Sequence, residues 1–170
     1  MKIRLVIGAA ILASVALAIP VSVIAAGAAA APTTPTAFSA TFLGIPGTTE
    51  LVPGSFRVAN GNVFETVTDE VYFTGGFAGY SAEQIHIVGH PDGSIEFYGS
   101  DLCSCTVGGS FVGTITLPFS GNGAPDGSTI GYIVIGKGTG GLTNLHGTAT
   151  FLSSNGGESG TWSGVYHFAP

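Results

Sequence analysis

The chain has 170 residues, and its ten Asp or Glu residues against four Lys or Arg give a net charge of −6 at pH 7. A chain this poor in cations has no basic patch for phosphate groups, which argues against nucleic acid and anionic membrane surfaces as partners. Glycine is abundant, at 28 residues, and only two cysteines are present.

The N-terminal segment has the three parts of a secretory signal peptide. Lys2 and Arg4 precede an apolar run from Leu5 to Ile19, and small residues follow from Ala26 to Ala31. This order predicts a leader over residues 1–31, cleaved after Ala28 or Ala30, and a secreted or cell-surface protein. An uncleaved membrane anchor is the alternative, because residues 5–31 are long enough to span a bilayer. Pro20 and the alanine-rich end favour cleavage, after which we expect no membrane segment.

The mature chain is the size of one domain. Residues 32–170 number 139, enough for a single hydrophobic core. Residues 32–36 (PTTPT) are predicted to be a linker, and residues 37–170 form the domain. Of the cations only Arg57 and Lys137 remain against ten carboxylates, so the mature net charge is −8.

Beyond residue 31 the pattern predicts strands and no helices. Apolar residues never recur at helical spacing, and short alternating segments are separated by Gly and Pro turns, which is typical of an all-β sandwich or barrel. The first strand covers Phe38–Leu43. Asn60-Gly61 predicts a type I′ hairpin between strands at 56–59 and 63–73.

The segment from Glu83 to Ser100 predicts a hairpin whose register can be argued. A turn at Pro91-Asp92 pairs Ile87 with Phe97 and Ile85 with Gly99. This register gathers the apolar side chains on one face, whereas a slip by one residue would mix the faces. The apolar face holds Ile85, Ile87, Ile95 and Phe97, and the other holds His86, Val88, His90, Glu96 and Tyr98.

The next segments differ in polarity. Alternate residues from Phe111 to Phe119 form a buried face, and Ser120–Ser128 (SGNGAPDGS) is predicted to be a long polar loop. Ile130–Ile135 (IGYIVI) is apolar on both faces, which suggests a strand covered on each side, with a neighbouring subunit as one cover.

The last third predicts a closing hairpin. In 161–168 the residues Trp162, Gly164, Tyr166 and Phe168 share one face, and 146–152 alternates in the same way. Ser153–Glu158 connects the two strands, with Asn and Gly available for positive φ. Glycines beside aromatics on a buried face suit a tightly coiled strand with a close neighbour.

The run GTGGLTNLHGT at 138–148, followed by GTWSGVY at 160–166, resembles the C-terminal part of allene oxide cyclase-like barrels. The chain is especially similar to small bacterial members of that superfamily whose function is unknown. Asp69–Gly75 and Cys105–Gly109 stand at compatible spacings, so the resemblance covers about 37–168. It implies a single antiparallel up-and-down barrel of about eight strands, of calycin type, with a mostly apolar lumen. No catalytic motif carries over residue by residue.

The only two cysteines of the chain stand close together, in the sequence Cys103-Ser104-Cys105. Export favours an intramolecular disulfide between Cys103 and Cys105. In a regular strand the two Cβ atoms stand too far apart, so we expect a bulge or turn there. A free dithiol or a soft metal site completed from elsewhere are the alternatives.

The four histidines do not predict a metal site. His86 and His90 lie near Asp92 and Glu96, but no HxH or HExxH motif exists, so we expect no bound metal. His86, Glu96 and Tyr98 would form an acid–base group only if their face lined a pocket, and the register places them outside. No P-loop or dinucleotide fingerprint is present, and we expect no cofactor.

Three functions fit this chain. The first is a noncatalytic barrel that takes a small apolar ligand in a lumen lined by Phe111, Trp162, Tyr166 and Phe168. The second is an isomerase or cyclase resembling allene oxide cyclase, which needs a polar group facing the lumen beside the apolar wall. The third is a structural or surface-interaction protein that forms a homo-oligomer through Ile130–Ile135.

Overall fold

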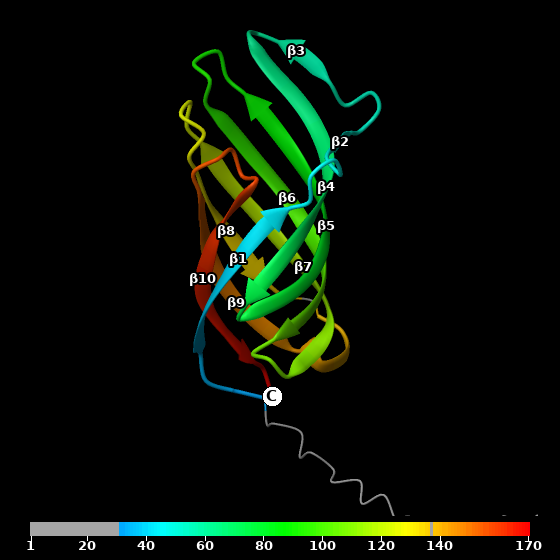
Figure 1. Cartoon of the computed structure of the whole chain (residues 1–170), viewed down its shortest axis with the longest axis vertical. Coiled ribbons are helices and arrows are strands. Elements are labelled where there is room, and N and C mark those ends of the chain that lie inside the picture. The colour runs from blue at the N-terminus through cyan, green and yellow to red at the C-terminus, as the bar shows by residue number, and fades with distance from the viewer. Residues whose placement is uncertain (1–30, 137) are drawn as a thin grey trace, which may run out of the picture.

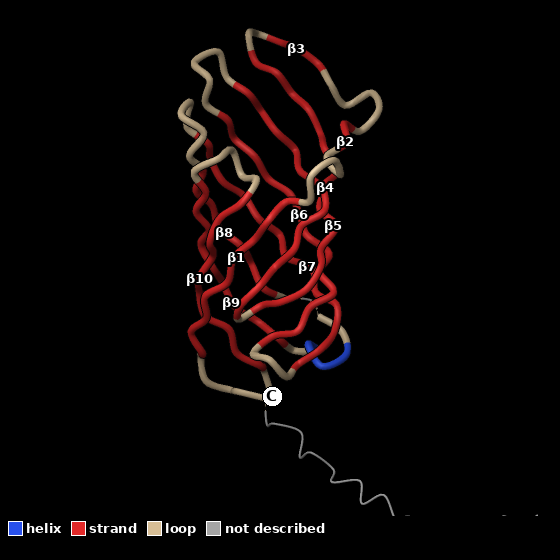
Figure 2. Tube along the Cα trace, in the orientation of Figure 1, coloured by secondary structure: helices blue, strands red, loops and turns tan. Residues whose placement is uncertain are grey.

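The computed structural model describes residues 31–136 and 138–170. The predicted leader therefore lies outside the described residues, apart from Ala31. Ten strands and one short 3-10 helix follow one another along the chain (Figures 1 and 2). They are β1 (Thr36–Gly44), β2 (Glu50–Leu51), β3 (Arg57–Ala59), β4 (Asn62–Gly75), β5 (Phe77–Gly89), β6 (Ile95–Val107), β7 (Phe111–Gly123), β8 (Thr129–Ile135), η1 (Gly140–Leu142), β9 (Leu145–Ser153) and β10 (Ser159–Phe168).

Eight of these strands close into an antiparallel barrel, as the sequence predicts. From β4 to β10 each strand pairs with the next in the chain, and β1 closes the circle between β10 and β4. The first half of β4 extends beyond β1 and pairs instead with the short strands β2 and β3. Figure 1 shows this extension at the end of the barrel opposite the C-terminus.

The predicted hairpins are confirmed. In β5–β6 the pairs are Ile87 with Phe97 and Ile85 with Gly99. Asn60 and Gly61 take φ angles of 52° and 82°, the left-handed values that a type I′ turn requires. In β10 the large side chains of the predicted face, Trp162, Tyr166 and Phe168, are all buried.

One expectation about the region after Phe119 is wrong. The polar loop predicted over 120–128 is shorter, because β7 continues to Gly123, which pairs with Ile95 at the start of β6. A strand next to a long partner keeps its hydrogen bonds as far as the partner extends, whatever its polarity. The expected cover of β8 by a neighbouring subunit stays a prediction: within this chain the outer-facing Ile130, Tyr132 and Val134 are 53–67% exposed.

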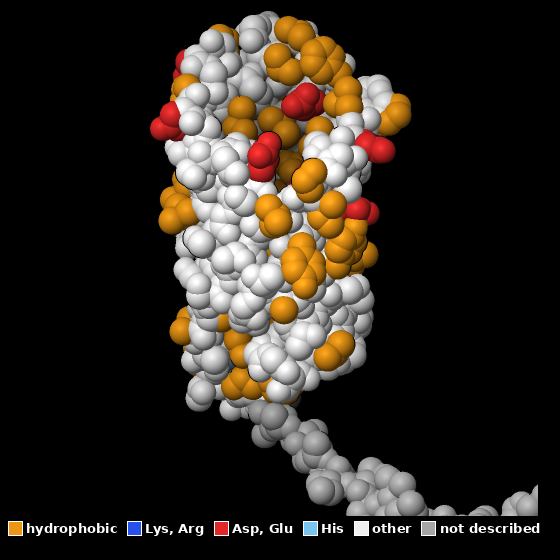
Figure 3. Space-filling model, in the orientation of Figure 1, with side chains coloured by type: hydrophobic (Ala, Val, Ile, Leu, Met, Phe, Trp, Pro, Cys, Tyr) orange, Lys and Arg blue, Asp and Glu red, His pale blue; other side chains and the backbone are white. Residues whose placement is uncertain are grey.

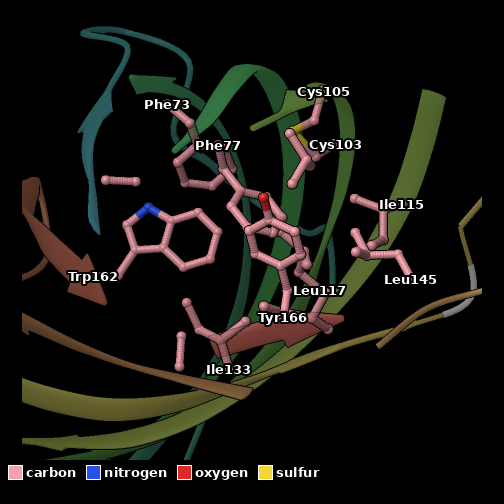
Figure 4. Close-up of a cluster of buried hydrophobic side chains, with 14 of the residues drawn as sticks. Phe73, Phe77, Cys103, Cys105, Ile115, Leu117, Ile133, Leu145, Trp162 and Tyr166 are labelled. Atoms are coloured by element: carbon pink, nitrogen blue, oxygen red, sulfur yellow. A yellow bond between two sulfur atoms is a disulfide. The ribbon is translucent and has the colours of Figure 1, made fainter. Parts of the chain in front are cut away.

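The half of the barrel that holds the C-terminus is packed solid. Trp162 lies between Phe77 and Phe73, with ring centroids 4.8 and 5.3 Å away, and Tyr166 lies next to Phe77 (Figure 4). Leu142 of η1 is fully buried and covers this end. The core also contains Ala40, Val71, Cys103, Cys105, Val107, Ile115, Leu117, Ile133, Ile135, Leu145, Ala149, Phe151 and Phe168.

Among the described residues, no helix has the length and apolar character needed to cross a membrane.

Candidate functional site

The other half of the barrel holds an open cavity of about 320 Å³. Figure 3 shows a hollow towards this end, with hydrophobic side chains inside it and acidic side chains at its rim. All eight barrel strands contribute to its lining: β4, β5, β6 and β8 give two or more residues each, and β1, β7, β9 and β10 give one each. The lining residues are Phe42, Thr49, Val67, Asp69, Val71, Phe73, Glu83, Ile85, Ile87, Ile95, Phe97, Asp101, Phe119, Thr129, Ile133, Phe151, Gly156, Gly157, Glu158 and Trp162.

The barrel opens at this end because its strands differ in length. β1 ends at Gly44, whereas β4 extends far past the last residue that pairs with β1. The β9–β10 loop closes part of the gap, since the amide of Gly44 donates a hydrogen bond of 2.7 Å to the carbonyl of Glu158. Thr49 and the 156–158 segment line the cavity at this gap.

Most of the wall is apolar and comes from the faces that the alternating pattern predicts. Ile85 and Ile87 of β5 and Ile95 and Phe97 of β6 all line the cavity. On the opposite wall the ring of Phe151 lies 5.9 Å from that of Phe97. An apolar cavity of this kind, with few polar groups, is the usual form of a small-molecule site.

Three carboxyl groups interrupt the apolar wall. Asp69, Glu83 and Asp101 lie side by side on β4, β5 and β6, because Glu83 pairs with Asp69 on one side and with Asp101 on the other. All three line the cavity. The hydroxyl of Ser81 donates a hydrogen bond of 3.0 Å to Asp101, and that of Thr48 donates one of 2.6 Å to Asp69.

Burial in the barrel favours the protonated forms of Glu83 and Asp101. Burial, followed by the charges of Asp101 and Asp69, raises the pKa of Glu83 to about 9. Burial also raises the pKa of Asp101 to about 7, although the hydrogen bond from Ser81 acts in the opposite direction. At pH 7 the Glu83–Asp101 pair therefore keeps at least one proton and can both donate and accept hydrogen bonds.

Two further polar atoms in the wall have no partner. Trp162 Nε1 and Thr129 Oγ1 are buried and make no hydrogen bond to any described residue. Their side chains are 1% and 5% exposed, and both line the cavity. A buried polar atom without a partner costs about 1–3 kcal/mol, so such atoms are rare unless a bound molecule completes them.

Of the four predicted ligand-binding aromatics, the structure brings only Trp162 to the cavity. Phe111, Tyr166 and Phe168 belong to the packed half, where Phe111 lies 4.8 Å from Phe168 between ring centroids. All four occupy inward-facing positions of their strands. The alternating pattern gives the direction of a side chain but not its depth along the barrel axis, which explains the difference.

The sequence interpretation did not single out Glu83 and Asp101. Both stand in phase with inward-facing residues: Glu83 is two residues before Ile85, and Asp101 two before Cys103. A charged residue in phase with a buried face is the signal that could have found them. Asp69, on β4, pairs across the strands with Glu83 of β5.

The histidine-containing face lies outside the barrel, as the predicted register requires. The ring of His86 stacks on Tyr98 with centroids 4.7 Å apart, and Tyr98 is largely exposed. His90 Nε2 lies 3.9 Å from the Glu96 carboxylate. Within residues 31–136 and 138–170, no three His, Cys, Asp or Glu side chains form a group that could hold a metal ion.

The sulfur atoms of Cys103 and Cys105 lie at disulfide distance, with their Cα atoms 5.4 Å apart. The expected bulge or turn is wrong, because β6 pairs without interruption with β5 and β7 through these residues. Both cysteines are buried in the packed half, so they take no part in the cavity.

The comparisons with known proteins agree with the barrel. A crystal structure of a protein of unknown function from the DUF3224 family of Shewanella oneidensis MR-1 superposes with a TM-score of 0.66 at 16% identity, covering 81% of this chain and 100% of that one. At this identity the likeness shows the fold alone. No curated protein matches the chain.

Neither comparison confirms the predicted relation to allene oxide cyclase-like barrels, which stays a prediction. The model of the DUF3224 family, described as a protein of unknown function, matches residues 47–163, well over half of the sequence. The chain therefore belongs to the DUF3224 family.

Proposed function

We propose that this protein is an exported barrel that binds a small, mostly apolar molecule in the open half of its lumen. The observation that carries the proposal is the cavity of about 320 Å³, walled by aliphatic and aromatic side chains. If the cavity were only a packing defect, apolar atoms alone would line it. Here the unpartnered Trp162 Nε1 and Thr129 Oγ1 lie in the same wall, where the polar groups of a ligand would complete them.

The fluorescence of Trp162 tests this proposal directly. It is the only tryptophan of the chain and it lines the cavity, so its emission reports on binding there. We expect at least one member of a panel of fatty acids, terpenoids and alkyl amines to change the emission saturably. An unchanged emission across the panel would contradict the proposal.

A matched pair of substitutions locates the binding. Ile87→Phe adds volume inside the cavity, whereas Ile130→Phe makes the same change on the exposed outer face. We expect the first to weaken binding at least tenfold and the second to leave it unchanged. Equal effects would place the ligand elsewhere.

A second candidate is an isomerase or cyclase, and the Glu83–Asp101 pair favours it. A pair that holds a proton in an apolar cavity can supply an acid and a base on one wall, as proton-transfer catalysis requires. We would incubate the protein with apolar epoxides and enolisable ketones and analyse the products by chiral chromatography. A product ratio equal to that in buffer would exclude this activity for those substrates.

The third function, a structural or surface-interaction role, would use the outer face of β8. Ile130, Tyr132 and Val134 form an exposed apolar row there. Light scattering at micromolar concentration tests whether this row joins two copies of the chain, and a monomer would contradict that version.

A further inference from the structure

Every titratable group among the described residues that line the cavity is a carboxyl group. These groups are Asp69 on β4, Glu83 on β5, Asp101 on β6 and Glu158 in the β9–β10 loop. No Lys, Arg or His is among the described residues that line it. The described lining residues therefore supply no positive charge to balance these carboxyl groups.

Ionising a carboxyl group that is buried in this cavity is unfavourable in free energy. Asp101 is 5% exposed, and its neighbour in the β-ladder is a second carboxyl group. Buried charges in proteins are normally paired with an opposite charge or bound to a metal. The described residues offer neither, since no metal-holding group is found among them. The missing positive charge would have to enter with the ligand.

The remaining walls suit an organic cation. The neighbouring aromatic rings of Phe42, Phe97 and Phe151 line the cavity, and such rings attract ammonium groups as well as apolar surface. Thr129 Oγ1, which is buried and has no partner, can accept a hydrogen bond from an ammonium group. It marks the cavity as one that takes a polar molecule, independently of the carboxyl groups.

We infer that the ligand of this cavity is an apolar amine, whose ammonium group pairs with the Asp69–Glu83–Asp101 row while its hydrocarbon part lies against the isoleucines and phenylalanines. This inference rests on the proposed function and specifies the chemical class of the ligand. On binding, the ammonium group replaces the proton that the Glu83–Asp101 pair otherwise keeps, and that proton leaves to the solvent.

Three probes with one apolar body and different charge test the inference. Phenylbutylamine is a cation, phenylbutanol is neutral and phenylbutanoate is an anion near neutral pH. At pH 8 we expect the amine to bind at least tenfold more tightly than the alcohol, and the anion to bind most weakly. The preference for the amine should shrink towards pH 5, where Glu83 and Asp101 are protonated, although the amine, like a lysine with its pKa of about 10.4, stays charged.

Calorimetry of the unmodified protein gives a second readout. In two buffers with different ionisation enthalpies at pH 7, we expect the amine to release up to one proton on binding and the alcohol to release none. This measurement needs no variant, so it stays decisive if substitutions in the wall impair folding.

Variants test whether the Asp69–Glu83–Asp101 row causes the preference for the amine. We expect Glu83→Gln and Asp101→Asn to reduce the preference for the amine at least fivefold, with folding checked by circular dichroism. Glu96→Gln, on the exposed outer face, should leave it unchanged. Equal effects of the wall and outer variants would overturn the assignment.

The outcomes separate the inference from the proposed function. If amine and alcohol bind equally tightly at pH 8 without proton release, the inference fails and the apolar site remains. If none of the three probes and no member of the wider panel changes the emission of Trp162, the proposed function fails as well.

Discussion

The indole of Trp162 stands at the boundary between the two halves of the barrel. Its ring packs against Phe38, Phe73 and Phe77 in the solid half, and the same side chain lines the open half. In the wall of the same cavity, Glu83 and Asp101 occupy inward-facing positions where the alternating pattern of the strands alone would predict aliphatic side chains. Residues that break the local rule of a buried face in this way are expected at functional sites rather than in the core.

The raised pKa values of Glu83 and Asp101 make the fold less stable in alkali. Each pKa lies above its ordinary value, so the fold favours the protonated form. The stabilisation is present at acid pH, below the pKa of the unfolded chain, and is lost as the pH rises through about 7 and about 9. We expect the melting temperature to fall by about 10 °C or more from pH 5 to pH 9, because each pH unit over which a group is protonated only in the folded chain costs about 1.4 kcal/mol of stability.

Glu83→Gln removes one of the two titrations and should roughly halve this fall. Thermal melts followed by Trp162 fluorescence measure it. Glu96→Gln is the control, because the carboxyl group of Glu96 is exposed on the outside of the barrel. A wild-type melting temperature that is constant from pH 5 to pH 9 would contradict the prediction.

At the scale of single strands, β10 shows why the barrel needs glycine on its inner face. A Cβ atom on Gly164 would lie 2.6 Å from the Cα of Ala149 and would collide with the backbone carbonyl of Thr148 on β9. Such an approach is closer than real Cβ atoms allow, so the two strands would have to separate. The sequence analysis inferred this close approach from glycines placed beside aromatics, and the geometry confirms it.

Gly164→Ala should therefore destabilise the fold by about 1–3 kcal/mol, as overpacking typically does. Chemical denaturation measures the change. Gly136→Ala serves as the matched control, because no heavy atom lies within 4 Å of its added Cβ. Similar losses for both variants would show that the close approach in β10 is not the cause.

At the scale of the whole molecule, export remains a prediction that mass spectrometry can test. The leader with Lys2, Arg4 and the small residues up to Ala31 predicts cleavage after Ala28 or Ala30. We expect the intact mass of the protein from its native compartment to match one of these cuts, less two hydrogens for the Cys103–Cys105 disulfide. A full-length mass would support the membrane-anchor alternative, and free thiols would contradict the disulfide.

The sequence by itself determined the strand class, the hairpins and the inward faces. It did so because alternation and turn chemistry are local: Asn60-Gly61 sets its own turn, and the apolar residues of 85–97 select one register. For the same reason it identified Trp162 as an inward-facing residue.

Only the tertiary structure decided where along the barrel each inward residue lies. The depth of a side chain along the barrel axis depends on how neighbouring strands are staggered and on where each strand ends. This stagger places Phe111, Tyr166 and Phe168 in the solid half and Trp162 beside the cavity. The same stagger extended β7 through a polar segment and aligned Asp69, Glu83 and Asp101 from three strands in one row. These residues are 14 and 18 positions apart in the chain, and no local pattern records their meeting.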